Sequence, residues 1–186
     1  MKYMIASDLH GDAACIRKML ERFEAEGADT LLLLGDYLYH GPRNAIPEDY
    51  NTQESAALLN AYADRIVAIA GNCDAEVDQM LLDFPITSAY MMFPSEPDRA
   101  GKRVRVIAQH GQWSPAELHL ERGDVYLHGH THVLCAQMST AGYFEVNPGS
   151  VSLPKGGNPR SYAIWEDRTI TIKKLADGEM ITGVVF

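Results

Sequence analysis

Apolar residues in the first part of the chain follow two alternating kinds of spacing. Short runs of consecutive apolar residues predict buried strands at 2–7, 29–36 and 65–72. Between these runs, residues 12–27 and 52–64 carry apolar side chains at helical spacing. The order strand, helix, strand, helix, strand predicts right-handed crossovers and a parallel sheet.

The second part of the chain indicates a different kind of sheet. Residues 102–111 and 123–132 again resemble buried strands that end at polar residues. Turn residues separate four further segments, which predicts short antiparallel strands at 133–139, 142–150, 161–167 and 169–175. We therefore expect one α/β domain over residues 1–186. Its two sheets would pack face to face with helices outside, and one sheet would be richer in antiparallel strands.

Residues able to bind a metal follow each of five predicted buried strands. They are Asp8 and His10, Asp36, Asn72, His110, and the pair His130 and His132. A single Asp after a strand is usually a helix cap. Five strand ends that each carry Asp, Asn or His beside a glycine indicate a shared site instead, because ligands in open α/β sheets bind at the carboxyl ends of strands.

Composition narrows the classes of function. The length suits one domain, with 46% apolar and 22% charged residues. No run of eighteen apolar residues predicts a membrane span, and the N-terminus reaches Asp8 too early for a signal peptide. The net charge of −9 disfavours long nucleic acid as a partner. A small phosphorylated substrate held by metal ions stays compatible with that charge.

The three cysteines indicate reduced thiols. Cys15, Cys73 and Cys135 lie far apart and form no CxxC pair, and no secretion signal precedes them. We therefore expect a cytoplasmic protein. Cys15 and Cys135 fall in helix and strand patterns and are expected to act as small buried hydrophobes.

The motif order D-x-H, G-D, G-N-x-D, H and G-H-x-H resembles that of the calcineurin-like metallophosphoesterases. The resemblance covers essentially the whole chain and is closer still to the YfcE phosphodiesterase group. It rests on the stretches ASDLHG, LGDYLYHGPRNAIP, GNCDAEVDQMLLDFPIT, GHTH and NPGSVSLPKGGNP. It implies a four-layer α/β/β/α fold and a dinuclear metal site, commonly supplied with manganese.

The same resemblance implies two ligand sets that share one carboxylate. The first ion would take Asp8, His10, Asp36 and His132, and the second would take Asp36, Asn72, His110 and His130. Asp36 would bridge the ions and offset their repulsion, while the neutral amide of Asn72 limits the negative charge. Two ions about 3.5–4 Å apart could clamp a phosphoryl group and convert water to hydroxide near neutral pH. Oxygen and imidazole ligands suit manganese, iron, zinc or nickel alike.

Two further histidines are expected outside the ligand set. Gly129 breaks the alternation of the GHTH stretch, so only His130 and His132 should lie on its turn. His128 would then belong to the buried strand end, in the core or behind the ligands. His119 has no motif around it and is expected at the surface.

The chain departs from the wider family at two positions. Cys73 stands where relatives usually have a histidine that can protonate the leaving oxygen, and Gln112 stands where they often have another histidine. Cys73 could donate a proton or could be a small residue that opens the pocket, and we favour the second interpretation. No separate general acid is therefore assigned. We expect Asp74 to orient a ligand histidine.

The loop after Asp36 supplies candidates for substrate binding. His40, Arg43 and Asn44 are expected near the metals, and Arg43 offers a bidentate fork for phosphate. For Arg43 and for Lys155, a solvated surface role is the competing interpretation.

We expect a phosphodiesterase that hydrolyses a small phosphodiester through a hydroxide bound to two metal ions. The alternatives are a phosphomonoesterase or protein phosphatase, a nuclease, and a non-catalytic interaction scaffold on the same fold. The scaffold predicts missing ligands, and none of the seven is missing. A homo-oligomer is left open.

Overall fold

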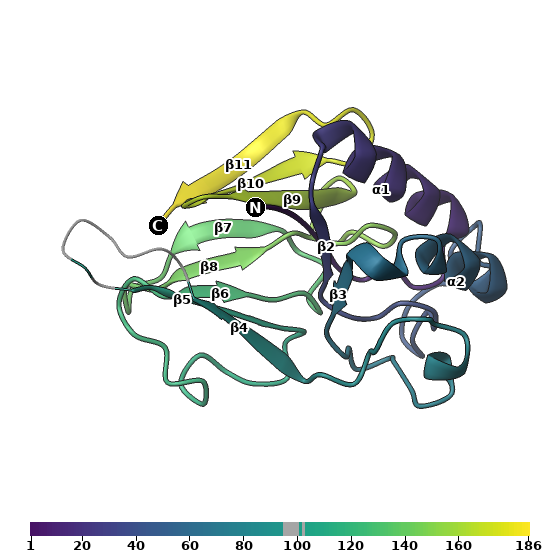
Figure 1. Ribbon diagram of the computed structural model, residues 1–186, viewed down its shortest axis with the longest axis horizontal. Helices are drawn as coiled ribbons and strands as arrows, with labels where there is room; N and C mark the ends of the chain where they lie inside the picture. The colour runs from purple at the N-terminus through teal and green to yellow at the C-terminus, as the bar shows by residue number, and fades with distance from the viewer. Residues whose placement is uncertain (95–100, 102) are drawn as a thin grey trace.

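Two mixed sheets face each other in the computed structural model, which describes residues 1–94, 101 and 103–186 (Figure 1). The six-stranded sheet has the order β11-β10-β9-β1-β2-β3, and the five-stranded sheet has the order β4-β5-β6-β8-β7. The strands are β1 (Lys2–Ala6), β2 (Thr30–Leu33), β3 (Ile66–Ala68), β4 (Tyr90–Pro94), β5 (Arg105–Gln109), β6 (Val125–Leu127), β7 (Cys135–Met138), β8 (Phe144–Asn147), β9 (Ser161–Glu166), β10 (Thr169–Lys174) and β11 (Met180–Val185).

Each sheet contains three adjacent parallel strands. In the larger sheet these are β1, β2 and β3, and in the smaller sheet they are β5, β6 and β8. The remaining strands pair antiparallel at the sheet edges. The parallel strands are the ones that the predicted metal ligands follow.

The consecutive apolar runs are buried on both faces, as parallel strands between two layers require. Alternate residues of β1 and β2, such as Met4 and Leu31, face the helices, while Ile5 and Leu32 face the second sheet. All four side chains are fully buried. The core therefore has two layers that share the six-stranded sheet.

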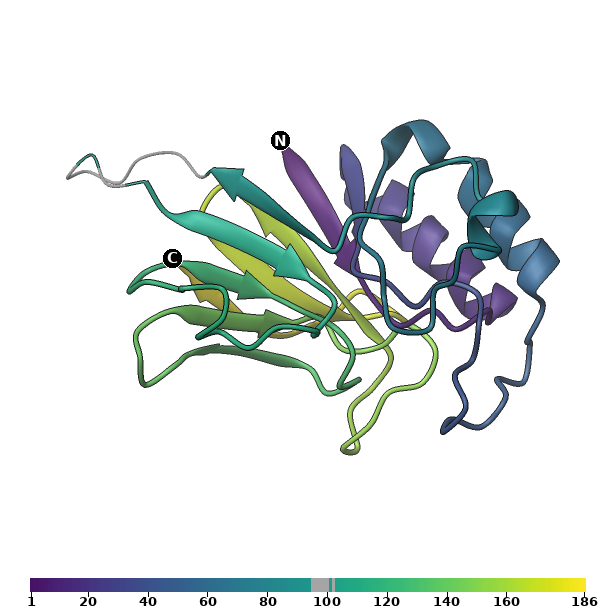
Figure 2. The ribbon, with the colours of Figure 1, turned by 90° about the horizontal axis from the view of Figure 1, so that it is seen from below.

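Both α-helices of the described chain pack on the six-stranded sheet (Figure 2). Helix α1 (Ala13–Glu26) begins at Asp12, whose carboxylate accepts the Cys15 N–H, and ends at Gly27 with φ 61°. Helix α2 (Thr52–Asn60) is capped by Asn51. Two short 3₁₀ turns follow, η1 (Ala63–Arg65) and η2 (Asp78–Met80), and the first of these ends the predicted helix 52–64.

The expected α/β sandwich of two mixed sheets is confirmed. The outer face of the five-stranded sheet carries residues 111–124, whose turns occupy the place of a second helical layer. Gln109 and Tyr126 on that face donate hydrogen bonds to the Trp113 carbonyl. One helical turn starts there at Ser114, whose Oγ accepts the Glu117 N–H while the Glu117 carboxylate accepts the Ser114 N–H, and it stops at His119, whose φ is 49°. The segment is therefore too short to form an α-helix.

Most predicted strands lie where the pattern placed them. The strand expected at 102–111 begins only at Arg105, and Lys102 lies outside the described residues. The pattern missed the edge strands β4 and β11. In β4 the exposed Tyr90 and Met92 are apolar, so polar and apolar residues do not alternate, and in β11 Thr182 and Gly183 interrupt the apolar residues. In the described chain, no helix combines the length and apolar character needed to cross a membrane.

Candidate metal centre

The carboxyl ends of β1, β2, β3, β5 and β6 bring all seven predicted ligands together. Asp8 and His10 follow β1, Asp36 follows β2, and Asn72 follows β3. His110 directly follows β5, and His130 and His132 lie on the turn after β6. The side chains form two adjoining groups.

The first group contains Asp8, His10 and His132, which are all buried. The Nε2 atoms of His10 and His132 lie 3.2 Å apart. The Oδ1 atom of Asp8 lies 3.3 Å from Nε2 of His132 and 3.8 Å from Nε2 of His10. These three atoms surround a point at which a single cation could contact all of them.

The second group is built around the amide oxygen of Asn72. This oxygen lies 3.0 Å from Nε2 of His110 and 2.5 Å from Nδ1 of His130. The two imidazole rings meet edge to face, with 5.2 Å between their centroids. His130 is thus the one ligand candidate that presents Nδ1 rather than Nε2 to the group.

Asp36 lies between the two groups. Its Oδ2 atom is 3.7 Å from Nε2 of His10 and 3.4 Å from Nε2 of His110, while its Oδ1 accepts the Cys73 N–H at 2.8 Å. Burial opposes the charge on Asp36, but the hydrogen bond and charge of His110 outweigh it and lower the pKa of Asp36 to about 2. A carboxylate that stays ionised between two donor groups suits a bridging position.

Hydrogen bonds determine which imidazole nitrogens carry protons. The Nδ1–H groups of His10, His110 and His132 donate to the carbonyls of Tyr39, Leu34 and Leu153, at 2.8, 2.7 and 2.6 Å. Their Nε2 atoms therefore face the site, which is the usual arrangement for metal-binding histidines. Burial lowers the pKa of His110, but the Asp36 carboxylate outweighs it and raises that pKa to about 9, so a bound ion would displace a proton from His110 Nε2.

The donor set fits a divalent cation. The buried Oδ1 of Asp8 has no hydrogen-bond partner among the described residues, and the lone pairs of His10 and His132 face each other beside it. A cation bound between these buried ligand atoms would stabilise their convergence. The residues of both groups could hold the divalent ions that the donor chemistry implies.

Most of the ligand candidates have a left-handed backbone conformation, which directs their side chains toward the site. Positive φ angles occur at Asp8 (56°), His10 (49°), Asp36 (59°), His130 (65°) and His132 (60°). Non-glycine residues seldom adopt this conformation, and strained backbone concentrates at functional sites. The spacing of these residues along the sequence does not predict their left-handed backbone.

Two glycines permit close approach of the loops. A Cβ at Gly129 would lie 1.9 Å from Oγ of Ser7, and a Cβ at Gly71 would lie 2.2 Å from Oδ1 of Asp36. Both glycines are therefore required by packing against the ligands rather than by chain flexibility.

The carboxylate of Asp74 holds the loop that carries Asp36. It accepts the N–H groups of Asp36, Tyr37 and Gly71 at 2.9, 2.8 and 2.7 Å. The sequence predicted that Asp74 would orient a ligand histidine, whereas in the structure its carboxylate accepts hydrogen bonds from the backbone at Asp36. Burial raises the pKa of Asp74 to about 6, against the effect of these N–H donors.

Two serines that the sequence analysis did not single out support the first group. The hydroxyls of Ser150 and Ser152 both donate to the carbonyl of Asp8, at 2.8 and 2.9 Å. They lie in the loop after β8, the sixth parallel strand end. The NPGSVS stretch carried the resemblance to the family, and it was the available signal for these residues.

The expected substrate residues lie in a hollow above the ligands. Arg43, Asn44 and Lys155 line this cavity of about 420 Å³ together with Asp36 and His130. We call it the metal hollow. His40 does not line it. Its ring packs between those of Tyr39 and Tyr50, with 4.7 and 5.4 Å between the ring centroids.

His128, His119 and Gln112 lie outside both groups. Nε2 of His128 lies 3.2 Å from Oε1 of Glu145, and its ring stacks on Tyr126. His119 is exposed, as expected. The Gln112 amide donates to the Ala70 carbonyl at 2.8 Å, which gives it a structural contact.

Cys73 lines the metal hollow with a protonated thiol. Its Sγ accepts a hydrogen bond from the Asn72 amide at 3.2 Å. Burial, and next the charge of Asp36, raise the pKa of Cys73 to about 12. These contacts agree with the interpretation of Cys73 as a small pocket residue.

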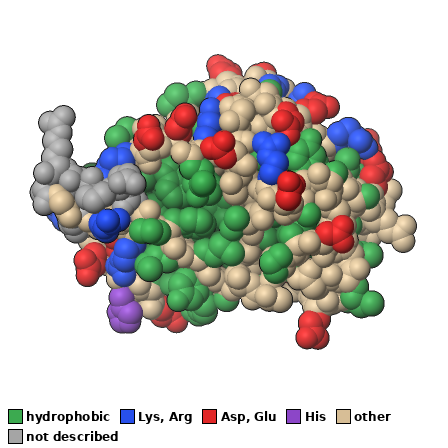
Figure 3. Space-filling model, viewed as in Figure 1, with side chains coloured by type: hydrophobic (Ala, Val, Ile, Leu, Met, Phe, Trp, Pro, Cys, Tyr) green, Lys and Arg blue, Asp and Glu red, His purple; other side chains and the backbone are tan. Residues whose placement is uncertain are grey.

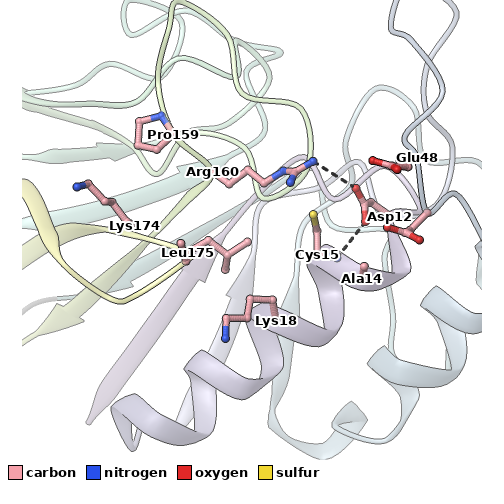
Figure 4. Close-up of a pocket in the computed structure, with 11 residues that line it drawn as sticks. Asp12, Ala14, Cys15, Lys18, Glu48, Pro159, Arg160, Lys174 and Leu175 are labelled. Carbon is pink, nitrogen blue, oxygen red and sulfur yellow. Dashed lines mark hydrogen bonds and ion pairs between the residues drawn. The ribbon is translucent and has the colours of Figure 1, made fainter.

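A separate hollow of about 420 Å³ lies beside α1 (Figure 4). Arg160 points toward Asp12 at 3.9 Å, and Lys18 and Lys174 also line this cavity. None of the seven ligand candidates lines it. The metal hollow is therefore the cavity that adjoins the candidate centre.

The fold and the donor set define a metal-dependent phosphoesterase architecture, and sequence comparison agrees. Residues 1–169 match the family model described as the calcineurin-like phosphoesterase superfamily domain. The chain belongs to this superfamily.

Individual relatives place the chain more narrowly. It is 43% identical over 186 residues to a curated protein named Phosphodiesterase YfcE from Escherichia coli K12, covering 99% of this chain and 97% of the relative. A solved structure of YfcE, described as a phosphoesterase from E. coli, matches with a TM-score of 0.90 and 42% identity, over 100% of this chain and 99% of that one.

A more distant match shows the fold alone. It is a structure of Vps29 from Entamoeba histolytica, described as complexed with zinc. It has a TM-score of 0.59 and 20% identity, over 100% of this chain and 99% of that one.

The role of Asp74 can be tested with the variant Asp74→Asn. An amide offers one acceptor oxygen and an NH₂ group that would face the N–H donors, so we expect the unfolding free energy to fall by about 1–3 kcal/mol. We also expect weaker metal retention, because the loop of Asp36 would shift. Denaturant titration of metal-stripped protein and metal analysis after dialysis provide the two measurements.

Asp78→Asn is the matched control, because the carboxylate of Asp78 accepts one hydrogen bond among the described residues, from the Ala75 N–H at the start of η2. Equal losses of stability and metal in both variants would contradict a specific role of Asp74.

Proposed function

We propose that this protein is a phosphodiesterase that hydrolyses a small phosphodiester at a centre of two divalent ions. The position of the Asp36 carboxylate between the two donor groups carries the proposal, since Oδ2 lies within 3.7 Å of both His10 Nε2 and His110 Nε2. The name of the E. coli relative, Phosphodiesterase YfcE, supports the choice of a diester.

The proposed ligands are divided between two ions. One ion would be held by Asp8, His10, Asp36 and His132, and the other by Asp36, Asn72, His110 and His130. Manganese is the proposed metal, and the oxygen and imidazole donors also suit zinc, iron or nickel. The zinc named for the Vps29 structure supports a divalent ion on this fold.

When its ions are bound, the centre would polarise the phosphoryl group of the substrate and activate a water molecule. The chain contributes positioning and charge. Arg43 can hold a non-bridging phosphate oxygen with two N–H groups, and Lys155 can add a second positive charge from the opposite loop. Asn72 coordinates without adding negative charge, which favours an anionic substrate.

The leaving oxygen has no assigned proton donor in this proposal. Cys73 faces the hollow, yet its thiol accepts a hydrogen bond from Asn72, and Gln112 is held by the Ala70 carbonyl. Good leaving groups should therefore be favoured.

Three competing functions receive less support. An interaction scaffold would not need seven converging ligand candidates, two of which have their backbone held by Asp74 and the two serines. A nuclease would need a basic groove, whereas acidic and basic side chains are interspersed on the face in Figure 3 and the net charge is −9. A phosphomonoesterase is the nearest alternative, and comparing diester with monoester hydrolysis distinguishes it from a phosphodiesterase.

Two broader expectations stay part of the proposal. We propose that residues 1–186 act as one domain, because both sheets contribute ligands to one centre. We propose a cytoplasmic location, which the three free cysteines favour. Assembly into a homo-oligomer is left to measurement.

Substrate class is the direct test of the proposed function. With added Mn²⁺, we expect kcat/KM for bis(4-nitrophenyl) phosphate to exceed that for 4-nitrophenyl phosphate, and EDTA to abolish both activities. Release of 4-nitrophenolate is the measurement. A preference for the monoester would favour the phosphomonoesterase, and inactivity toward both esters with metal bound would favour the scaffold.

Asp36→Asn tests the shared carboxylate. An amide offers only one ligand oxygen, so neither ion would be retained well, and we expect a loss of both from the purified protein. The measurement is the number of ions per chain by mass spectrometry, with exposed Asp64→Asn as the control. Retention of two ions by the Asp36 variant would refute the bridging role.

Arg43→Ala tests the phosphate contact. If Arg43 binds the same oxygen in the ground and transition states, KM should rise about tenfold or more while kcat changes little. Arg17→Ala on the exposed face of α1 is the control, since Arg17 pairs there with Glu54. Unchanged KM in the Arg43 variant would make this residue a solvated surface arginine.

A further inference from the structure

A second hollow adjoins the metal hollow at Cys73. This cavity of about 470 Å³ lies over the loops that follow β2 and β3, and we call it the apolar hollow. Cys73 is the residue that both cavities share among their described lining residues. Cys73 therefore lies at the boundary between the metal hollow and the apolar hollow.

The lining of the apolar hollow is mostly hydrocarbon and aromatic. Tyr39 and Tyr50 come from the loop after Asp36, and Val77, Met80 and Leu81 come from the segment after Asn72. Val77 is 62% exposed and Met80 is 83% exposed. Single exposed apolar residues are ordinary, but a group of them around one cavity indicates a binding surface.

The same two loops also position the metal ligands. The carbonyl of Tyr39 accepts Nδ1–H of His10 at 2.8 Å, and the N–H of Cys73 donates to Oδ1 of Asp36 at 2.8 Å. The apolar hollow is thus attached to the centre through main-chain contacts on both sides. The position of the apolar hollow relative to His10 and Asp36 therefore cannot change much without disturbing these two side chains.

The charges of the two hollows differ. Arg43 and Lys155 line the metal hollow, which suits the phosphate group. Asp78 is the charged residue among those that line the apolar hollow, and it accepts the Ala75 N–H. A second phosphate or a carboxylate placed there would find no cation, whereas an uncharged ring or alkyl chain would lose little by leaving water.

We propose that the apolar hollow binds one ester arm of the substrate, and that this arm is apolar and preferably aromatic. The inference rests on the proposed phosphodiesterase function and specifies its substrate class. The phosphate would lie between the metal ligands and Arg43, and the arm would pass Cys73 to reach Tyr39 and Met80.

Two unreactive analogues isolate the contribution of the arm. Monomethyl methylphosphonate and monomethyl benzylphosphonate each carry one negative charge, and only the second has an aromatic arm. As competitive inhibitors of bis(4-nitrophenyl) phosphate hydrolysis, we expect the benzyl compound to have a Ki about tenfold lower or more. The ratio of the two Ki values removes the contribution that the phosphonate group makes to both.

Met80→Glu should reduce that ratio toward one, because it places a carboxylate at the rim of the hollow. Its side chain is exposed, so the variant is expected to fold. Met138→Glu is the matched control on β7, where Met138 is 60% exposed and lines neither hollow. We expect the control to keep the wild-type ratio.

The outcomes separate the inference from the function on which it rests. Equal Ki values for the two analogues in the wild type would overturn the proposal that the hollow binds an apolar arm. A Ki ratio that Met80→Glu leaves intact would do the same, and either result would favour a protein partner on this surface. Failure to hydrolyse any diester would overturn the proposed function, and this inference with it.

Discussion

The structure depends on a set of buried carboxylate and imidazole groups that converge at the strand ends. The Nδ1 protons of His10, His110 and His132 are all directed to backbone carbonyls, which leaves three Nε2 atoms facing this convergence. Asp8 and Asp36 add carboxylates that are almost fully buried. Burying a polar group without full compensation costs about 2–7 kcal/mol, so a bound cation would stabilise this end of the fold.

The backbone around this site is strained in a way that the rest of the molecule must offset. Five ligand candidates have positive φ, and each such residue costs about 1–3 kcal/mol. Asp74 offsets this at the loop of Asp36 with three hydrogen bonds, and Ser150 and Ser152 do so at the carbonyl of Asp8. The ligand positions are therefore determined by the protein before any ion binds, as expected for a preorganised centre.

The pattern of residues predicted the parallel strands because their burial on both faces leaves a simple signal, as in Ile5 and Leu32. It also predicted the polar residues at the strand ends, because topology alone brings those ends together. The edge strand β4 has one exposed face, but its exposed residues Tyr90 and Met92 are apolar, so it lacks the alternation that marks a half-buried strand. The partner of Asp74 could not be predicted, since its contacts are to main-chain N–H groups that carry no sequence information.

Main-chain atoms of the loops hold the ligands, while side chains of the same loops line the hollows. Tyr39 and Leu153 contribute carbonyls to His10 and His132, and Cys73 contributes its N–H to Asp36. A carbonyl or N–H is present whatever the side chain, so these contacts constrain only the path of the chain. The side chains of Tyr39 and Cys73 are correspondingly free to meet the requirements of a substrate. One set of metal ligands can thus be combined with different hollows, and substrate preference is to be sought in the loop side chains rather than in the centre itself.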